Sequence, residues 1–115
     1  MPLPTISLVI MFLFLMITGG NVNFVNGQKN WCVANPSTAD NALLDNLHFA
    51  CSIVDCSIML GKKGLCFYPD NLISHASLAM NLYYQTKGRN SWNCHFNGTG
   101  LIVLTDPSYG KCKYA

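Results

Sequence analysis

The chain has 115 residues, and its seven Lys and Arg residues against five Asp, with no Glu, leave a net charge of +2. This length excludes more than one ordinary domain. The positive charge is weak and scattered along the sequence, so it does not indicate a nucleic-acid partner or an anionic surface as ligand.

The N-terminal segment has the pattern of a secretory signal peptide. An almost unbroken apolar run, Ile6 to Ile17, has the length of a signal-peptide core and is shorter than the ~20 residues of a membrane span. The small residues Val25 and Gly27 suit a cleavage site, which predicts residues 1–27 as the signal peptide. Cleavage after Gly20 is the alternative.

The remaining segment, residues 28–115, contains every cysteine of the chain: Cys32, Cys51, Cys56, Cys66, Cys94 and Cys112. An even cysteine count in a small secreted domain predicts a disulfide framework, with 15 pairings open. A zinc site is the rival interpretation, but there is no CxxC pair and the histidines lack ligand-like spacing. We therefore expect no metal and no other cofactor. The C-terminus KCKYA has no hydrophobic tail, so we also expect a freely secreted monomer without a membrane anchor.

A first helix is predicted near position 40. Ser37 or Thr38 can cap it, and Asp40 lies in its first turn, where the helix dipole favours negative charge. Its apolar stripe consists of Leu43, Leu47 and Ala50, joined by Leu44 and Cys51. His48 lies off that stripe and is interpreted as a surface residue.

The segment between the two helices is short and turn-rich. Cys51 and Cys56 enclose only four residues, so a bridge between them would close a tight loop. Asp55 can cap a short turn that starts at Ser57. The sequence GKKG then predicts an exposed turn before Cys66.

A longer helix is predicted between an N-cap at Asp70 or Asn71 and a stop at Gly88. Residues at helical spacing form a stripe that we expect to be core: Leu72, Ala76, Ala79, Met80 and Tyr83.

The other side of this helix is polar and is predicted to face solvent, with Ser74, Ser77, Asn81, Tyr84 and Gln85, and Leu78 beside them. A neutral sugar has an apolar face on which Tyr84 can stack. Asn81 and Gln85 can hydrogen-bond its hydroxyls without any charge. A plain solvated face with one exposed tyrosine is the alternative.

After Gly88 the sequence predicts strands. The segments 92–96 and 101–105 are rich in aromatic and β-branched residues, and Asn97-Gly98 between them predicts a hairpin turn. Asn97-Gly98-Thr99 is also a glycosylation sequon, which a hairpin tip would expose. A turn at 106–110 and a short third strand at 112–114 follow. Helices first and strands afterwards predict an α+β fold.

Six motifs in order resemble one plant family: WCVANP, CSIVDCS, LCFYPDN, SHASLAMNLYYQ, CHFNGTG and TDPSYGKCKY. The chain is similar to the callose (β-1,3-glucan) binding module, carbohydrate-binding family 43, and most similar to its small secreted, pollen-allergen-like members. The resemblance covers positions 31–114.

The resemblance implies two packed helices with a small antiparallel sheet, non-catalytic binding of β-1,3-glucan in the plant cell wall, and three disulfides: Cys32–Cys94, Cys51–Cys56 and Cys66–Cys112. The family usually has SHASYAFNSYYQ in the main helix, where this chain has Leu78, Met80 and Leu82 in place of Tyr, Phe and Ser. Met80 can fill a core position. Leu78 predicts that one stacking platform is missing from the sugar face.

Three functions compete. For glucan binding, the predicted contacts are Tyr84, Asn81 and Gln85, with Tyr109 and Asp106 on the final turn as weaker candidates; capping of that turn is the alternative role of Asp106. A glycoside hydrolase needs two carboxylates across the scissile bond, and the five Asp residues mostly have cap or helix-surface explanations. Ser74 and His75 point about 100° apart on a helix, so they form no catalytic pair. The third function is a scaffold that has lost sugar binding and recognises a protein.

Overall fold

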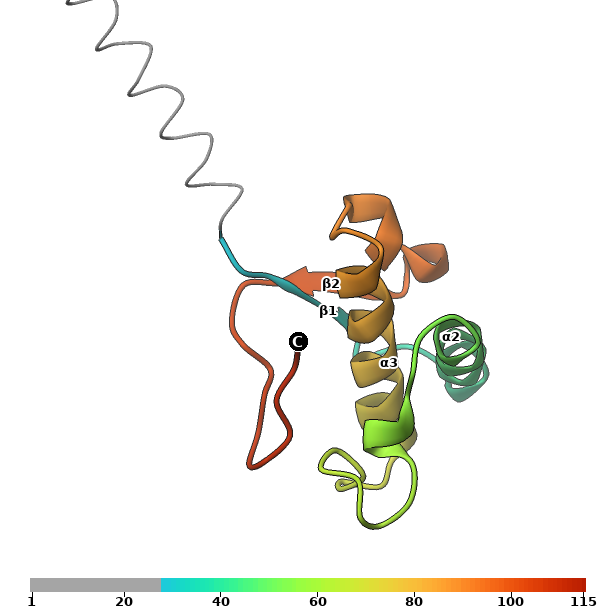
Figure 1. Ribbon diagram of the computed structural model, residues 1–115. Helices are drawn as coiled ribbons and strands as arrows, with labels where there is room; N and C mark the ends of the chain where they lie inside the picture. Colours follow the sequence, from blue (N-terminus) through green and yellow to red (C-terminus); the bar gives the residue numbers. More distant parts are fainter. Residues whose placement is uncertain (1–27) are drawn as a thin grey trace, which may run out of the picture.

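The computed structural model describes residues 28–115, so the signal peptide predicted at residues 1–27 lies outside the described residues. The described part is α+β, as predicted, with two α-helices and a two-stranded antiparallel sheet. In chain order its elements are β1 (Trp31–Ala34), α2 (Asp40–Cys51), the 3-10 turn η1 (Ser57–Met59), α3 (Leu72–Thr86), the 3-10 turns η2 (Ser91–Cys94) and η3 (Phe96–Gly98), and β2 (Gly100–Val103) (Figure 1). Over residues 28–115, no helix is both long and apolar enough to cross a membrane.

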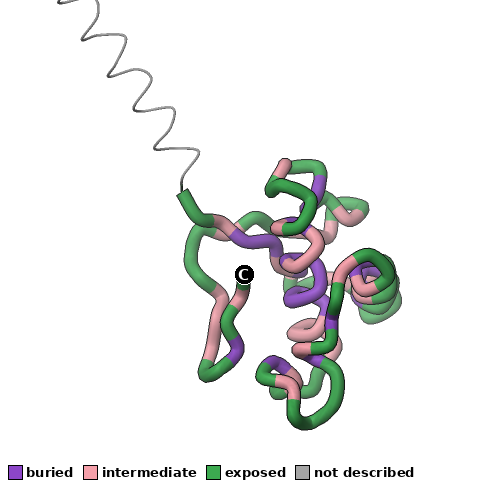
Figure 2. Tube along the Cα trace, viewed as in Figure 1, coloured by how far each residue is buried: buried purple, intermediate pink, exposed green. Residues whose placement is uncertain are grey.

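The helix α3 is the centre of the domain. Asn71 is its N-cap, as predicted, and the Asn71 Oδ1 accepts a hydrogen bond from the Ser74 N–H at 2.9 Å. Gly88, with φ of 99°, reverses the chain just after the helix. Every residue from 76 to 81 is buried, which is more than one full turn (Figure 2). This part of α3 therefore has no solvent-facing side, unlike an amphipathic surface helix.

The strand β1 lies between β2 and α3. On one edge it pairs with β2, with Cys32 opposite Ile102. On the other edge, the N–H of Cys32 donates to Asn81 Oδ1 and the N–H of Ala34 donates to Ser77 Oγ, both at 3.0 Å. Because N–H groups of alternate residues point to the same edge of a strand, α3 takes the place of a third strand. The polar residues of α3 satisfy backbone donors that would otherwise be buried without partners.

The start of α2 differs from the prediction. Its N-cap is Ala39, with no side-chain hydrogen bond, so a cap at Ser37 or Thr38 is wrong. The Ser37 N–H and hydroxyl both donate to Asn35 Oδ1, because the Asn-Pro sequence forms a local turn that uses these groups first. The Thr38 hydroxyl is buried without a partner. His48 is exposed, as predicted.

All three disulfides that the resemblance implied are present: Cys32–Cys94, Cys51–Cys56 and Cys66–Cys112. The first and third close loops of 62 and 46 residues, each stabilising the fold by about 4 kcal/mol in the chain-entropy account. The short loop between Cys51 and Cys56 leads into η1, where Asp55 Oδ1 accepts from the Ser57 N–H at 2.9 Å, also as predicted.

The predicted hairpin is wrong. Asn97 and Gly98 do have the positive φ that an Asn-Gly turn requires, 54° and 80°. Residues 91–98 wind into η2 and η3, however, so that Asn97 and Gly98 lie within η3, and β2 pairs with β1. The reason is tertiary: Cys94 is bonded to Cys32 of β1, and the backbone of Gly100 passes so close to the Cys94 carbonyl that any Cβ would clash. The predicted third strand at 112–114 is also wrong, since only an isolated bridge between Tyr109 and Cys112 forms there.

Candidate functional site

A groove of about 440 Å³ opens where α2, α3 and the turns η2 and η3 meet. Such a volume falls in the range of ~300–1,000 Å³ that is typical of small-molecule sites. Its lining combines four aromatic rings with three side-chain amides, one carboxylate and one imidazole: Phe49, Tyr83, Trp92, Phe96, Asn46, Asn93, Asn97, Asp45 and His95.

Three of the rings form a cluster at the groove. Phe49 of α2 lies edge-to-face on Tyr83 of α3, with ring centroids 5.2 Å apart. Phe96 of η3 completes the cluster at 5.7 Å from Tyr83 and 6.3 Å from Phe49. Edge-to-face pairs of this kind stabilise each other and fix the ring planes. The cluster is therefore a preformed apolar surface, and Phe49 remains about half exposed.

Trp92 lies on the rim of the groove. Its side chain is 72% exposed, the largest value among the exposed large apolar residues of the described chain. Neither the core nor an aromatic partner explains a tryptophan in this position. An indole ring that is held beside a groove and left in water is a common feature of binding surfaces, because the ring is rigid and offers a large contact area.

The amides of the groove are held by hydrogen bonds. Asn46 Nδ2 donates to Thr99 Oγ1 at 2.8 Å, and Thr99 Oγ1 donates in turn to the Phe96 carbonyl at 2.6 Å. Asn93 Oδ1 accepts from the Asn90 N–H at 3.2 Å. These bonds connect α2 to η3 and position amide groups beside the rings. The groove thus offers apolar faces and uncharged hydrogen-bonding groups together.

The sugar-binding face predicted on α3 is not at the surface. Tyr84 is 1% exposed and Asn81 0%, so the expected exposure of both residues is wrong. The Tyr84 hydroxyl donates to Asn30 Oδ1 at 2.6 Å, and burial raises the pKa of this hydroxyl. Asn81 uses its oxygen for the N–H of Cys32 and its Nδ2 for the carbonyl of Ala115 at 3.3 Å. The physical reason is that β1 covers this face and needs its polar groups as backbone partners.

Two of the other predicted contacts lie together at a second, smaller cavity of about 110 Å³. Gln85 and Asp106 both line it, together with Tyr114, whose pKa burial raises to about 12. Gln85 Nε2 donates to the carbonyl of Asn30 at 2.9 Å. Since residues 83 and 85 are about 200° apart on a helix, this cavity and the aromatic groove lie on different sides of α3.

The final turn has the structural role that was the alternative for Asp106. Its Oδ1 accepts from the hydroxyl of Ser108 at 2.5 Å and from the Ser108 N–H at 2.8 Å, and these donors hold the pKa of Asp106 below its usual 3.8. Tyr109 does not line either cavity; it packs, half-buried, against the cluster around Cys66 and Cys112.

Leu78 is 2% exposed and belongs to the same core cluster as Ala79. The departure from the family pattern at this position is thus a core substitution, and the expectation that a stacking platform is missing from the surface is wrong. His75 packs at the start of α3, and its Nε2 donates to the Phe67 carbonyl at 2.8 Å.

Sequence reasoning did not identify the residues of the groove. The sequence pattern predicts Tyr83 in the core stripe of the helix, and it predicts a strand for Trp92 and Phe96. The signal that was available is the density of aromatic and amide residues in the segment SWNCHFN, which is unusual for one strand of a small sheet. No local pattern places Phe49 beside this segment, because the contact depends on how α2 packs against α3.

The fold and the groove define a small disulfide-bonded α+β module with an aromatic surface groove. Residues 30–101 match the family model of the X8 domain. The chain is 43% identical over 90 residues to the major pollen allergen Ole e 10 of Olea europaea, covering 76% of this chain and 72% of the allergen. It belongs to the X8 domain family, which confirms the resemblance found in its motifs.

Further relatives carry similar segments. The chain is 44% identical over 86 residues to a glucan endo-1,3-beta-D-glucosidase of Olea europaea, covering 74% of this chain and 18% of that enzyme. It is 34% identical over 106 residues to plasmodesmata callose-binding protein 2 of Arabidopsis thaliana, covering 91% of this chain and 52% of that protein. The chain thus spans about a fifth of the glucosidase and about half of the callose-binding protein.

Proposed function

We propose that this protein binds β-1,3-glucan through the aromatic groove between α2, α3 and the turns η2 and η3. The observation that carries the proposal is the juxtaposition of the Phe49–Tyr83–Phe96 cluster with the exposed ring of Trp92 and three amides. Membership of the X8 domain family and the names of the callose-binding relatives support the choice of ligand.

The chemistry of the groove suits a neutral polysaccharide. A pyranose ring has an apolar C–H face that can lie on an indole or phenyl ring, and its hydroxyls can exchange hydrogen bonds with amides. Asp45 is the single carboxylate among the described residues that line the groove, and no Lys or Arg lines it. The exposed Asp45 carboxylate can accept hydrogen bonds from sugar hydroxyls, so the groove binds a neutral ligand without needing a charged partner.

Binding without hydrolysis is the activity proposed. Cleavage of a glycosidic bond ordinarily requires an acid and a second carboxylate about 5–10 Å from it. Asp45 has no carboxylate partner along the described lining of the groove. The glucosidase relatives are several times longer than this chain, so their activity is not carried over to it.

The proposal includes a location and a modification. We propose a secreted, monomeric protein of the plant cell wall, released after cleavage of residues 1–27. We also propose that Asn97 is N-glycosylated, because the sequon Asn97-Gly98-Thr99 is intact and the Asn97 side chain is exposed.

Native affinity electrophoresis in gels that contain laminarin tests the groove, with hydroxyethyl cellulose as the control polysaccharide. We take the binding free energy of a sugar ring stacked on Trp92 to equal that of an aromatic pair, about 0.5–1.5 kcal/mol. The Trp92→Ala variant should then lose affinity about 2- to 13-fold. The matched control is Tyr68→Ala, which removes an aromatic ring that is 60% exposed outside the groove. Equal retardation of Trp92→Ala and the parent protein, or no retardation of the parent, would contradict the proposal.

The smaller cavity is a second candidate contact for the same ligand, because Gln85 and Asp106 both line it. The Gln85→Ala variant in the same gels tests this cavity independently of Trp92. Of the remaining predicted contacts, Tyr84 and Asn81 are assigned to the interior, and the half-buried Tyr109 to the cluster around Cys66 and Cys112. The competing function, recognition of a protein, depends on Leu78 and Leu82 adding apolar area near an exposed face. Leu78 is buried and Leu82 packs partly buried against the cluster around Cys66 and Cys112, so neither residue supports it.

A further inference from the structure

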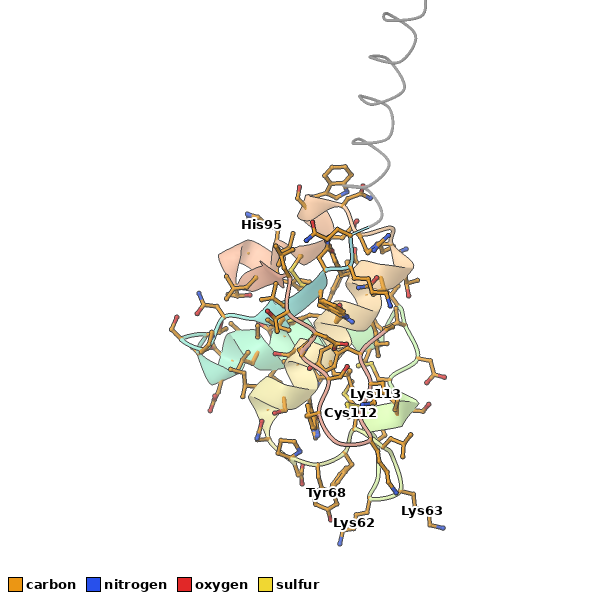
Figure 3. The ribbon with its side chains drawn as sticks, turned by 90° about the vertical axis from the view of Figure 1, so that its left-hand side faces the viewer. Lys62, Lys63, Tyr68, His95, Cys112 and Lys113 are labelled. Atoms are coloured by element: carbon orange, nitrogen blue, oxygen red, sulfur yellow. A yellow bond between two sulfur atoms is a disulfide. The ribbon has the colours of Figure 1, made fainter. Side chains whose placement is uncertain are left out.

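One end of the molecule is both apolar and basic. Between η1 and α3, Leu60 is 66% exposed, Leu65 58% and Tyr68 60%. Lys62 and Lys63 lie between the two leucines and are also exposed. Figure 3 shows Lys62, Lys63 and Tyr68 projecting together from the end of the molecule that lies away from His95, which lines the groove. We call residues 60–68 the tip.

The tip is a fixed structure. The Gly64 N–H donates to the Gly61 carbonyl and the Cys66 N–H donates to the Ile58 carbonyl, both at 3.0 Å. Gly61 has φ of 73°, and a side chain at Gly64 would clash with the Ile58 carbonyl, so the turn requires glycine at both ends of the lysine pair. The two leucines are thus held in water by a preformed turn, which lowers the entropic cost of binding through them.

A disulfide concentrates the charge at this end. Cys66 of the tip is bonded to Cys112, whose neighbours Lys111 and Lys113 are exposed. Figure 3 shows Lys113 beside Cys112, above Tyr68, Lys62 and Lys63. The disulfide therefore joins a segment with two exposed lysines to the tip, which has two exposed lysines of its own. Asp70 is the one acidic residue between positions 56 and 105, whereas Asp106 lies close enough to Lys113 for that lysine to contribute to its lowered pKa.

We propose that the tip docks onto an anionic lipid surface, with Leu60, Leu65 and Tyr68 entering the headgroup region and the lysines contacting lipid phosphates. Apolar side chains combined with lysines are the composition of interfacial membrane contacts. An acidic polysaccharide would pair with the lysines and leave both leucines in water, so the exposed leucines favour lipid. With the groove away from this end, the protein would join β-1,3-glucan to a membrane surface; the docking itself does not depend on the proposed glucan binding.

Vesicle flotation tests this docking. The protein is recovered from the medium of a secreting yeast culture, and its mass is measured to establish that the apolar run Ile6 to Ile17 is absent. It is mixed with vesicles of phosphatidylcholine alone or of phosphatidylcholine with phosphatidylserine. The variants are Lys62→Glu/Lys63→Glu and Leu60→Ser/Leu65→Ser. Matched controls make the same changes at exposed positions outside the tip, Lys87→Glu and Leu104→Ser.

We expect flotation with the anionic vesicles, reduced by high salt. Each basic residue contributes about fivefold to binding, so the Lys62→Glu/Lys63→Glu variant should bind at least about 25-fold more weakly than the parent. The Leu60→Ser/Leu65→Ser variant should bind at least about tenfold more weakly. The controls should bind like the parent. Absence of flotation, equal binding to phosphatidylcholine alone, or equal losses in controls and tip variants would overturn the proposal. Retention on immobilised polygalacturonate without flotation would overturn it in favour of an acidic polysaccharide.

Discussion

The Asn81→Leu substitution distinguishes the structural role of Asn81 from the sugar contact predicted from its sequence pattern. Leucine has a similar shape and leaves the N–H of Cys32 without its acceptor at 3.0 Å. Gln85 Nε2 retains the Asn30 carbonyl, so the backbone donor of Cys32 is the main group left unpaired.

The expected loss follows from that single orphaned donor. A buried donor without a partner costs about 1–3 kcal/mol of the free energy of unfolding. For a domain of this size, each kcal/mol lowers the melting temperature by about 4–8 °C, which predicts a decrease of roughly 5–20 °C. Because Cys32 lies in β1, we expect the sheet to lose protection against hydrogen exchange as well.

Thermal unfolding followed by circular dichroism, with the disulfides intact, measures the effect. The matched control is Asn41→Leu at an exposed position of α2, for which we expect a change within about 0.5 kcal/mol. If Asn81→Leu melts with the control but loses its retardation by laminarin, then Asn81 is a surface ligand residue. The docking of β1 on α3 would then be refuted.

Three further predictions concern titration and modification. The pKa of Asp106 is lowered in the folded state, so the stability it contributes is present above its usual pKa of 3.8 and is lost as the pH falls through the lower folded value; Asp106→Asn should flatten the melting temperature in acid, and an unchanged acid profile would argue against the Ser108 contacts. The pKa of Tyr114 is raised to about 12, so its contribution is complete below pH 10 and is lost toward pH 12. Ultraviolet titration should therefore show the same phenolate absorbance near pH 10 for the parent and for Tyr114→Phe, with the parent gaining one further group toward pH 12. A smaller absorbance of the variant already near pH 10 would contradict the burial of Tyr114. A glycan on Asn97 would lie at the lining of the groove, so enzymatic removal of the glycan, or Asn97→Gln, should strengthen retardation by laminarin; equal retardation of both forms would place the glycan outside the ligand path.

Several features follow from local sequence signals. Asn71 caps α3 because a short side-chain oxygen precedes a helical run, and Gly88 ends the helix region because it tolerates a positive φ. Asp55 accepts from the Ser57 N–H just before η1, as a short side-chain oxygen in a local turn. The α+β class and the presence of a disulfide framework could likewise be predicted, since composition and cysteine count depend on no distant contact.

Polarity on α3 illustrates what a local pattern leaves open. Helical periodicity correctly groups Ser77, Asn81 and Tyr84 on one side of the helix, but it does not state which partner satisfies their polar groups. Water and a strand edge are equally good partners for an amide or a hydroxyl. Because β1 packs on this side of α3, Asn81 and Ser77 accept hydrogen bonds from its N–H groups instead of water, and all three residues are buried.

The sequence by itself determined the helix positions, the N-cap of α3, the turn between Asp55 and Ser57, and the cysteine framework whose pairing the family resemblance supplied. Only the tertiary structure decided that β2 pairs with β1, that Phe49 contacts Tyr83 and Phe96, and that the segment around Cys112 is bonded to the tip. The physical reason is that caps and turns depend on neighbours within a few residues. The groove and the tip depend on contacts between segments far apart in the chain, which the packing and the disulfides select.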